Sequence, residues 1–181
     1  MPIDIMLDLE TLATTPDTVI LSCAAVKFNA FSLDESEDYV VNLNLKLDID
    51  QQIELGRKVD DNTIDWWSKQ DPEIRNQAFD DKNRVGIADF ILELNKFVVA
   101  ADRIWAQGPV FDIVILENLY RQIGYPIPWP YYNIRDSRTL IKACGWGIEH
   151  ERFGAHDALE DCKYQAGYVK KIVNKFGLVK L

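Results

Sequence analysis

The stretch IMLDLET, residues 5–11, places two carboxylates two positions apart within an apolar run. Isoleucine, leucine and methionine, followed by a turn-forming TTPD segment, predict a β-strand at residues 3–9 and a loop after it. Side chains two apart in a strand leave the same face of the sheet, so Asp8 and Glu10 are expected side by side. A divalent cation would supply the counter-charge that this pair needs. A solvated strand end is the alternative interpretation.

Two more strands and then a helical section are expected after this stretch. VILSCAAVKF at residues 19–28 and YVVNLNL at residues 39–45 are rich in strand-forming residues. With the first strand they predict an antiparallel meander. From residue 48 to about 101, capping residues and proline precede apolar residues at helical spacing, which indicates a mainly helical section.

The C-terminal part of the chain alternates strands and helices. The expected elements are a strand at 103–106, a helix at 111–124, a proline-rich loop at 125–133, a brief strand near 133–135, a helix at 137–145 and a last helix from about 157 to 176. A composition of 48% hydrophobic and 27% charged residues is typical of a globular chain. No repeat or linker divides the sequence, so a single α/β domain over residues 1–181 is predicted.

Several classes of protein are disfavoured by the sequence. Cys23, Cys144 and Cys162 form no C-x-x-C pair, which argues against a disulfide framework and against a thiolate zinc site. No apolar run approaches the roughly 20 residues that cross a bilayer. The N-terminus lacks the basic and apolar regions of a secretory signal. A cytoplasmic protein without a membrane partner is therefore expected.

The charge is negative but unevenly distributed. With 20 basic and 29 acidic residues the formal net charge is −9, which disfavours a protein that coats duplex nucleic acid by electrostatics alone. Acidic residues dominate residues 1–120, whereas basic residues outnumber them in residues 121–181. An anionic partner is expected beside the C-terminal third.

A second acidic motif lies in FGAHDALEDC, residues 153–162. Asp161 falls on the side of the apolar stripe of the last helix, where a carboxylate needs a metal or a salt bridge. His156 is five residues earlier and is expected on the loop that enters this helix. Gly154 permits a sharp approach, and Asp157 can cap the first turn. A histidine placed there can take up and release a proton over a metal-bound carboxylate; a surface histidine is the alternative.

Asp112 is expected at the start of a helix, directly after a strand and a turn. Acidic residues at helix starts are usually caps that suit the helix dipole. Strand ends and the following helix starts are also where α/β sheets gather ligands.

The five residues together resemble a known family. They are Asp8 and Glu10 in DLET, Asp112 in FDIVIL, and His156 and Asp161 in HDALED. Their order and spacing are similar to the three motifs of the DEDDh branch of the DnaQ-like 3′–5′ exonucleases. The resemblance implies a ribonuclease H-like mixed β-sheet, an antiparallel meander plus parallel strands, flanked by α-helices.

The resemblance extends over most of the chain. TIDWWSKQDPE at residues 63–73 and NIRDSRT at residues 133–139 resemble segments of the exonuclease A type of the T-even bacteriophages. One departure is visible. Many relatives carry asparagine shortly before the second-motif aspartate, whereas Gln107-Gly108-Pro109 stands here.

The family implies a mechanism for this chain. Two Mg²⁺ or Mn²⁺ ions would be held by the metal ligands Asp8, Glu10, Asp112 and Asp161. His156 would act as the general base in hydrolysis of the terminal phosphodiester of single-stranded DNA, releasing nucleoside 5′-monophosphates. An exoribonuclease or oligoribonuclease of the same family is the alternative, and a nucleic-acid-binding module without catalysis is a third hypothesis.

Further residues are candidates for substrate binding. Leu9 and Thr11 resemble positions that pack on or bond to the terminal nucleotide. One of the adjacent Trp66 and Trp67 is expected to be buried and the other exposed, and Trp67 is predicted to contact a base. Basic residues that could hold the backbone of the nucleic acid are Arg135, Arg138, Lys142 and Arg152. Relatives include monomers and dimers, so a homodimer is among the expected states.

Overall fold

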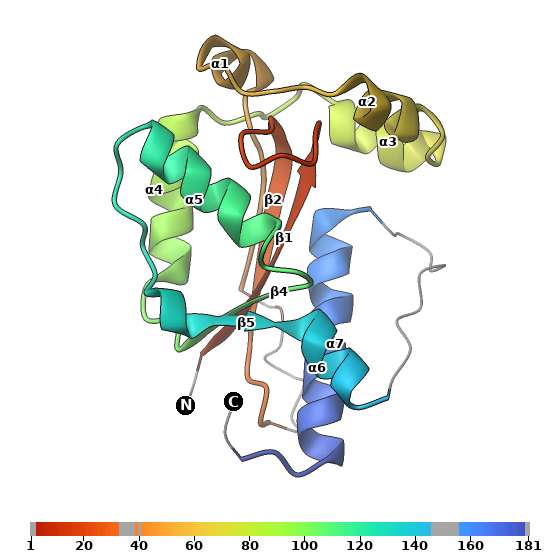
Figure 1. Cartoon of the computed structure of the whole chain (residues 1–181), viewed down its shortest axis with the longest axis vertical. Helices are drawn as coiled ribbons and strands as arrows, with labels where there is room; N and C mark the ends of the chain where they lie inside the picture. Colours follow the sequence, from red (N-terminus) through yellow and green to blue (C-terminus); the bar gives the residue numbers. More distant parts are fainter. Residues whose placement is uncertain (1–2, 33–38, 40, 146–155, 180–181) are drawn as a thin grey trace.

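The computed structural model describes residues 3–32, 39, 41–145 and 156–179. These residues form a five-stranded sheet in the order β3-β2-β1-β4-β5 (Figure 1). The strands are β1 (Asp4–Thr11), β2 (Ile20–Phe28), β3 (Asn42–Lys46), β4 (Arg103–Ala106) and β5 (Ile134–Asp136). β1, β2 and β3 pair antiparallel, whereas β4 pairs parallel with both β1 and β5. The predicted meander with added parallel strands is confirmed.

β3 begins later than the predicted strand at residues 39–45. Tyr39 has a φ of 64°, which lies in the left-handed region. A tyrosine in this conformation cannot continue an extended ladder. The regular pairing with β2 therefore starts only at Asn42, which lies opposite Val26.

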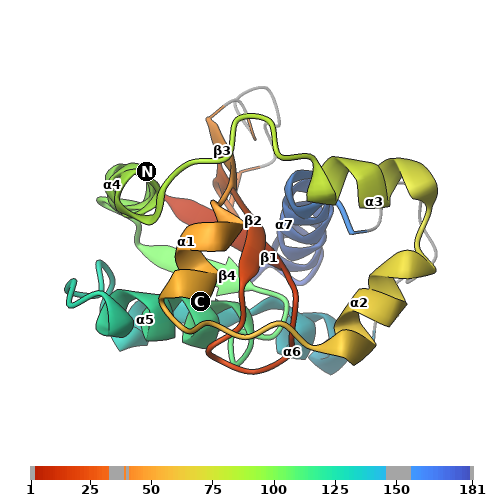
Figure 2. The ribbon, with the colours of Figure 1, turned by 90° about the horizontal axis from the view of Figure 1, so that it is seen from above.

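Helices cover both faces of the sheet (Figures 1 and 2). α4 (Ile87–Val98) and α5 (Asp112–Gln122) lie on one face, while α6 (Ser137–Ala143) and α7 (Ala158–Lys175) lie on the other. Three short helices, α1 (Ile49–Glu54), α2 (Asp61–Ser68) and α3 (Pro72–Phe79), lie beyond the end of the sheet at which β1 finishes. The helices predicted along the chain are thus confirmed, and the section between residues 48 and 101 is divided into four of them.

β1 separates two hydrophobic cores because its side chains alternate. Ile5, Leu7 and Leu9 point toward the core shared with α4 and α5. Met6, from the opposite face, packs in the core shared with α7. Asp8 and Glu10 have the same parity as Met6, so they are on the α7 side. A third cluster, around Trp67, lies beneath α2 and α3.

Aspartates begin five of the helices in the described chain. Their carboxylates accept hydrogen bonds from main-chain amides of the first turn, an arrangement that also suits the helix dipole. The capping residues are Asp48, Asp60, Asp71, Asp136 and Asp157. Part of the negative charge of the sequence therefore stabilises helix starts. None of the helices in the described segments is both long enough and apolar enough to span a bilayer.

Candidate active site

The site is built at the end of β1, where the strand approaches the start of α7. Glu10, His156 and Asp161 each offer one ligand atom, and these three atoms lie within 4.8 Å of one another. Glu10 is 8% exposed and Asp161 is 9% exposed. The two carboxylates, close together and little exposed, suit a divalent cation, and the imidazole of His156 lies beside them.

Asp8, also near the end of β1, is held by a side chain of α7. Its Oδ1 accepts a hydrogen bond of 3.0 Å from the side-chain amide of Gln165. Gln165 is 4% exposed, and its Oε1 has no hydrogen-bond partner within the described chain. Gln165 follows Asp161 by four residues, so both side chains project from one face of α7 toward β1.

Asp112 reaches the site from α5. Its Oδ1 accepts a hydrogen bond of 3.2 Å from the amide of Leu9. This amide is accessible because β4 pairs with β1 only up to Met6, which leaves the last part of β1 without a strand on that side. Asp112 therefore contacts the main chain at Leu9, between Asp8 and Glu10.

The carboxylates repel one another within a poorly solvated space. Burial raises the pKa of Glu10 well above its usual value, and the charges of Asp8, Asp112 and Asp157 add to this effect. Burial also raises the pKa of Asp112 to about 7, although amide hydrogen bonds and the charge of Arg138 act in the opposite direction. A bound cation would reverse this balance and favour the ionised carboxylates.

His156 lies on the turn before α7, as predicted. Its φ is 69°, in the left-handed region, and its amide donates a 3.0 Å hydrogen bond to Asp161 Oδ2. Asp157 caps α7 by accepting from the amides of Leu159 and Glu160, which confirms the predicted cap. Gly154, which was expected to permit the approach, lies outside the described residues.

A cavity of about 580 Å³ opens beside Glu10. It lies between the end of β1 and α2, and it would accommodate a nucleoside. Its lining includes Leu9, Glu10, Thr11, Asn62, Trp66 and Phe111. Leu9 and Thr11, predicted to contact the terminal nucleotide, therefore stand at this cavity. Their contact with substrate stays a prediction.

The two tryptophans of α2 have different environments. Trp67 is 1% exposed and donates a 3.0 Å hydrogen bond to the carbonyl of Thr11, whereas Trp66 is 40% exposed. The expectation of one buried and one exposed ring is confirmed. Trp67 forms the inner wall of the cavity, so Trp66 offers more ring surface to a base than the residue that we predicted to contact it.

Arg135 is placed differently from the other candidates. It lies on β5, the edge strand beyond β4, and its Nη1 donates to the carbonyls of Tyr132 and Ile134. A role in binding the substrate stays a prediction. Arg138 is closer to the carboxylates, since its charge acts on Asp112. Arg152 lies outside the described residues.

Some residues of the site escaped the sequence analysis. Gln165 bonds to Asp8, and Gln77 on α3 donates a 2.6 Å hydrogen bond to Asp157 Oδ2. Position 165 had a signal, because a glutamine on the apolar stripe of a helix needs a polar partner. Gln77 had none, since it is one of several polar residues on a short helix.

The fold and the converging motif residues define the class of this chain as a DnaQ-like 3′–5′ exonuclease of the DEDDh type. The family model described as the Rv2179c-like 3′–5′ exoribonuclease domain matches residues 3–173, and the chain belongs to that family. It is also similar to a curated protein named exodeoxyribonuclease from Enterobacteria phage T4. The identity is 25% over 190 residues, which cover 88% of this chain and 84% of the phage protein.

Solved structures share the fold. The zinc-bound complex of E. coli exonuclease I with single-stranded DNA is 17% identical, with a TM-score of 0.72 over 97% of this chain. This chain spans 41% of the exonuclease I chain. The nuclease domain of 3′hExo, a DEDDh family member bound to rAMP, is 10% identical, with a TM-score of 0.59 over 96% of this chain and 92% of that domain. The predicted ribonuclease H-like sheet is confirmed.

Proposed function

We propose that this protein is a divalent-metal-dependent exonuclease that degrades single-stranded DNA from the 3′ end to nucleoside 5′-monophosphates. The observation that carries the proposal is the approach of Glu10, His156 and Asp161 to within 4.8 Å beside a cavity of nucleoside size. The similarity to a phage exodeoxyribonuclease favours DNA as the substrate. The proposal covers residues 1–181 as one exonuclease domain.

The carboxylates would hold two ions, Mg²⁺ or Mn²⁺. Hard oxygen ligands are the donors that both ions prefer, and the mutual repulsion of Asp8, Glu10 and Asp112 supports cation binding. Bound ions would supply an acidified water and stabilise charge on the leaving 3′ oxygen. Gln165 would orient Asp8, and the Leu9 amide would orient Asp112.

The remaining chemistry belongs to side chains of this protein. An imidazole nitrogen of His156 would accept the proton of the attacking water, and the bond from the His156 amide to Asp161 fixes the main chain on which the imidazole is mounted. The cavity lined by Leu9, Thr11 and Trp66 would hold the terminal nucleoside and direct its phosphate toward the carboxylates. Arg138 would offer a positive charge to the next phosphate.

RNA is the second candidate substrate, because the matching family model is described as an exoribonuclease. DNA and RNA oligonucleotides of the same sequence, labelled at the 5′ end, separate the two when incubated with Mg²⁺ or Mn²⁺. We expect stepwise shortening of DNA at the higher rate and none in lanes without metal. Faster shortening of RNA would reassign the substrate.

Absence of mononucleotide release with either metal would favour the non-catalytic alternative. Full activity of the Asp161→Asn variant would do the same, because Asp161 is one of the proposed ligands. A homodimer remains part of the proposal, and sedimentation equilibrium of the full chain tests it.

A further inference from the structure

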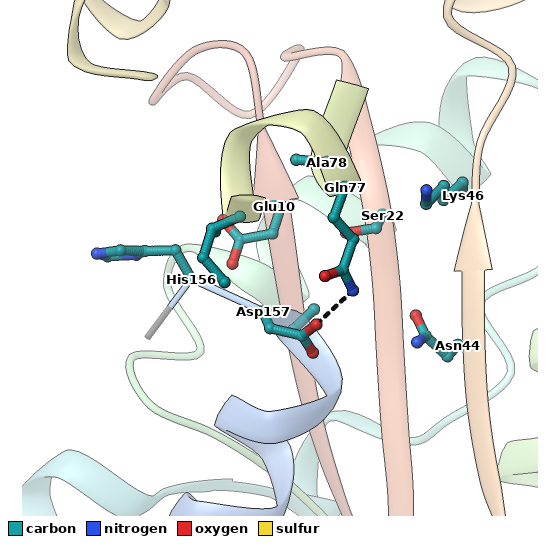
Figure 3. A pocket seen from close by; sticks show the side chains of 10 residues that line it. Glu10, Ser22, Asn44, Lys46, Gln77, Ala78, His156 and Asp157 are labelled. Atoms are coloured by element: carbon teal, nitrogen blue, oxygen red, sulfur yellow. Dashed lines mark hydrogen bonds between the residues drawn. The ribbon is translucent and has the colours of Figure 1, made fainter. Parts of the chain in front are cut away.

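The segment formed by α2 and α3 contacts the turn that carries His156 at two points. The ring of Trp66, on α2, lies edge to face with the imidazole of His156, with their centroids 4.8 Å apart and their planes at 88°. Gln77, on α3, donates a 2.6 Å hydrogen bond to Asp157 Oδ2. Figure 3 shows that Gln77 reaches Asp157 from one side while the His156 side chain extends to the other. The two contacts therefore hold neighbouring residues of one turn from different directions.

Trp66 is itself held in place. Its ring packs edge to face against Trp67, with centroids 5.1 Å apart. Trp67 is fixed by burial and by its hydrogen bond to the carbonyl of Thr11, the residue after Glu10. A rigid series of contacts thus runs from the metal-binding end of β1 through two indoles to the imidazole.

The contact with Trp66 acts on the imidazole itself. The main chain of His156 is fixed by its bond to Asp161 and by the capped start of α7, and both of these contacts act on the backbone of the turn. A φ of 69° is costly for a histidine, so the turn is maintained by its surroundings. An edge-to-face aromatic pair contributes about 0.5–1.5 kcal/mol, enough to favour one rotamer by up to about tenfold.

We propose that Trp66 is a positioning residue that holds the His156 imidazole in the orientation required for proton transfer. This inference deepens the proposed function and rests on it. The exposed part of the Trp66 ring lines the cavity, so a second role in stacking against a base has to be separated from this one by experiment.

A double-mutant cycle makes the separation. Trp66→Ala and Trp66→Phe are made in the wild-type and the His156→Ala backgrounds, and kcat and KM are measured on an oligonucleotide and on bis(p-nitrophenyl) phosphate, which has no base. We expect Trp66→Ala to lower kcat by up to about tenfold on both substrates, as the energy of the aromatic pair allows, and Trp66→Phe to restore most of it. In the His156→Ala background, Trp66→Ala should cause no further loss in kcat. Ile64→Ala, a truncation of an exposed apolar side chain on the same helix, is the matched control.

A readout without turnover comes from proton NMR of the metal-free protein. The sequence has two histidines, so the ring signals of His156 are assigned by their loss in His156→Ala. Trp66→Ala should move these signals, because the indole ring current no longer acts on them, whereas Ile64→Ala should not.

The outcomes separate the hypotheses. Losses that multiply in the His156→Ala background would overturn the positioning role, as would a change confined to KM on the oligonucleotide, which indicates stacking only. An unchanged His156 signal in Trp66→Ala would also contradict it. A wild-type protein without activity would instead overturn the proposed function.

Discussion

Neutralising Asp112 should make the metal-free protein more stable while removing its activity. Asp112 is 4% exposed, and burial raises the pKa of its carboxyl from 3.8 to about 7. The folded state therefore holds the proton of Asp112 more tightly than the unfolded chain does. The contribution of the protonated Asp112 carboxyl to the free energy of unfolding is fully present below pH 3.8 and is lost as the pH rises through about 7. Asp112→Asn should restore it, because an amide oxygen can still accept the hydrogen bond from Leu9.

The magnitude follows from the pKa. One pKa unit corresponds to about 1.4 kcal/mol. The raised pKa of Asp112 therefore lowers the free energy of unfolding by about 4 kcal/mol at pH 8, and by less than half as much at pH 5. Local relaxation reduces the measurable part, and we expect Asp112→Asn to stabilise by about 2–4 kcal/mol at pH 8. For a chain of this size each kcal/mol raises the Tm by roughly 2–4 °C.

The assay is thermal unfolding in EDTA at pH 5 and pH 8, repeated with Mn²⁺. Asp89→Asn, which neutralises an exposed carboxylate of α4, is the control and should change stability by less than about 0.5 kcal/mol. Mn²⁺ should raise the Tm of the wild type more than that of Asp112→Asn. A destabilised Asp112→Asn variant, or a gain equal at the two pH values, would refute the argument from charge burial.

Three further predictions concern residues around the site and in the core. Gln165→Leu removes the amide that orients Asp8. In a metal titration it should raise the Mn²⁺ concentration needed for half-maximal activity about 10- to 100-fold, and an unchanged titration would exclude a role for the amide. Arg57→Met leaves main-chain carbonyls of the loop after β1 without their hydrogen-bond donor. It should lower the free energy of unfolding in urea by about 2–4 kcal/mol, whereas unchanged stability would show that water replaces the guanidinium. Of the three cysteines, only Cys144 should react with a thiol reagent in the folded protein, because burial raises the thiol pKa of the other two; all three should react in urea.

The strands could be predicted because local sequence determines most of their character. β1 and β2 are apolar runs bounded by turn-forming residues, and the structure places them within one or two residues of their predicted limits. The start of β3 could not be predicted in this way. It depends on the left-handed conformation of Tyr39, which is rare for a tyrosine and which no sequence spacing indicates.

The candidate site was predictable only where an ordered motif existed. His156 was expected on the loop and Asp161 toward the core, since helical geometry separates residues five apart. The sequence could not tell which of Trp66 and Trp67 is buried. Adjacent positions on a helix face different directions, and only tertiary packing determines which of them faces the core. Contacts across elements, such as that of Gln77 with Asp157, depend on tertiary packing alone.

Three carboxylates lie on the same face of β1, and their charges are compensated by the protein in different ways. Asp4 is completely buried and accepts hydrogen bonds from Arg103 Nε and Nη2, Trp105 Nε1 and the amide of Ala30. Asp8, four residues further along the strand, is bonded by the neutral side-chain amide of Gln165 among its contacts. Glu10 accepts none from the described residues, and its pKa is raised by burial and by its acidic neighbours. The described residues thus compensate the charge of Asp4 at one end of the strand and leave that of Glu10 uncompensated at the end where the cavity opens, which is the arrangement required if a cation is to complete it.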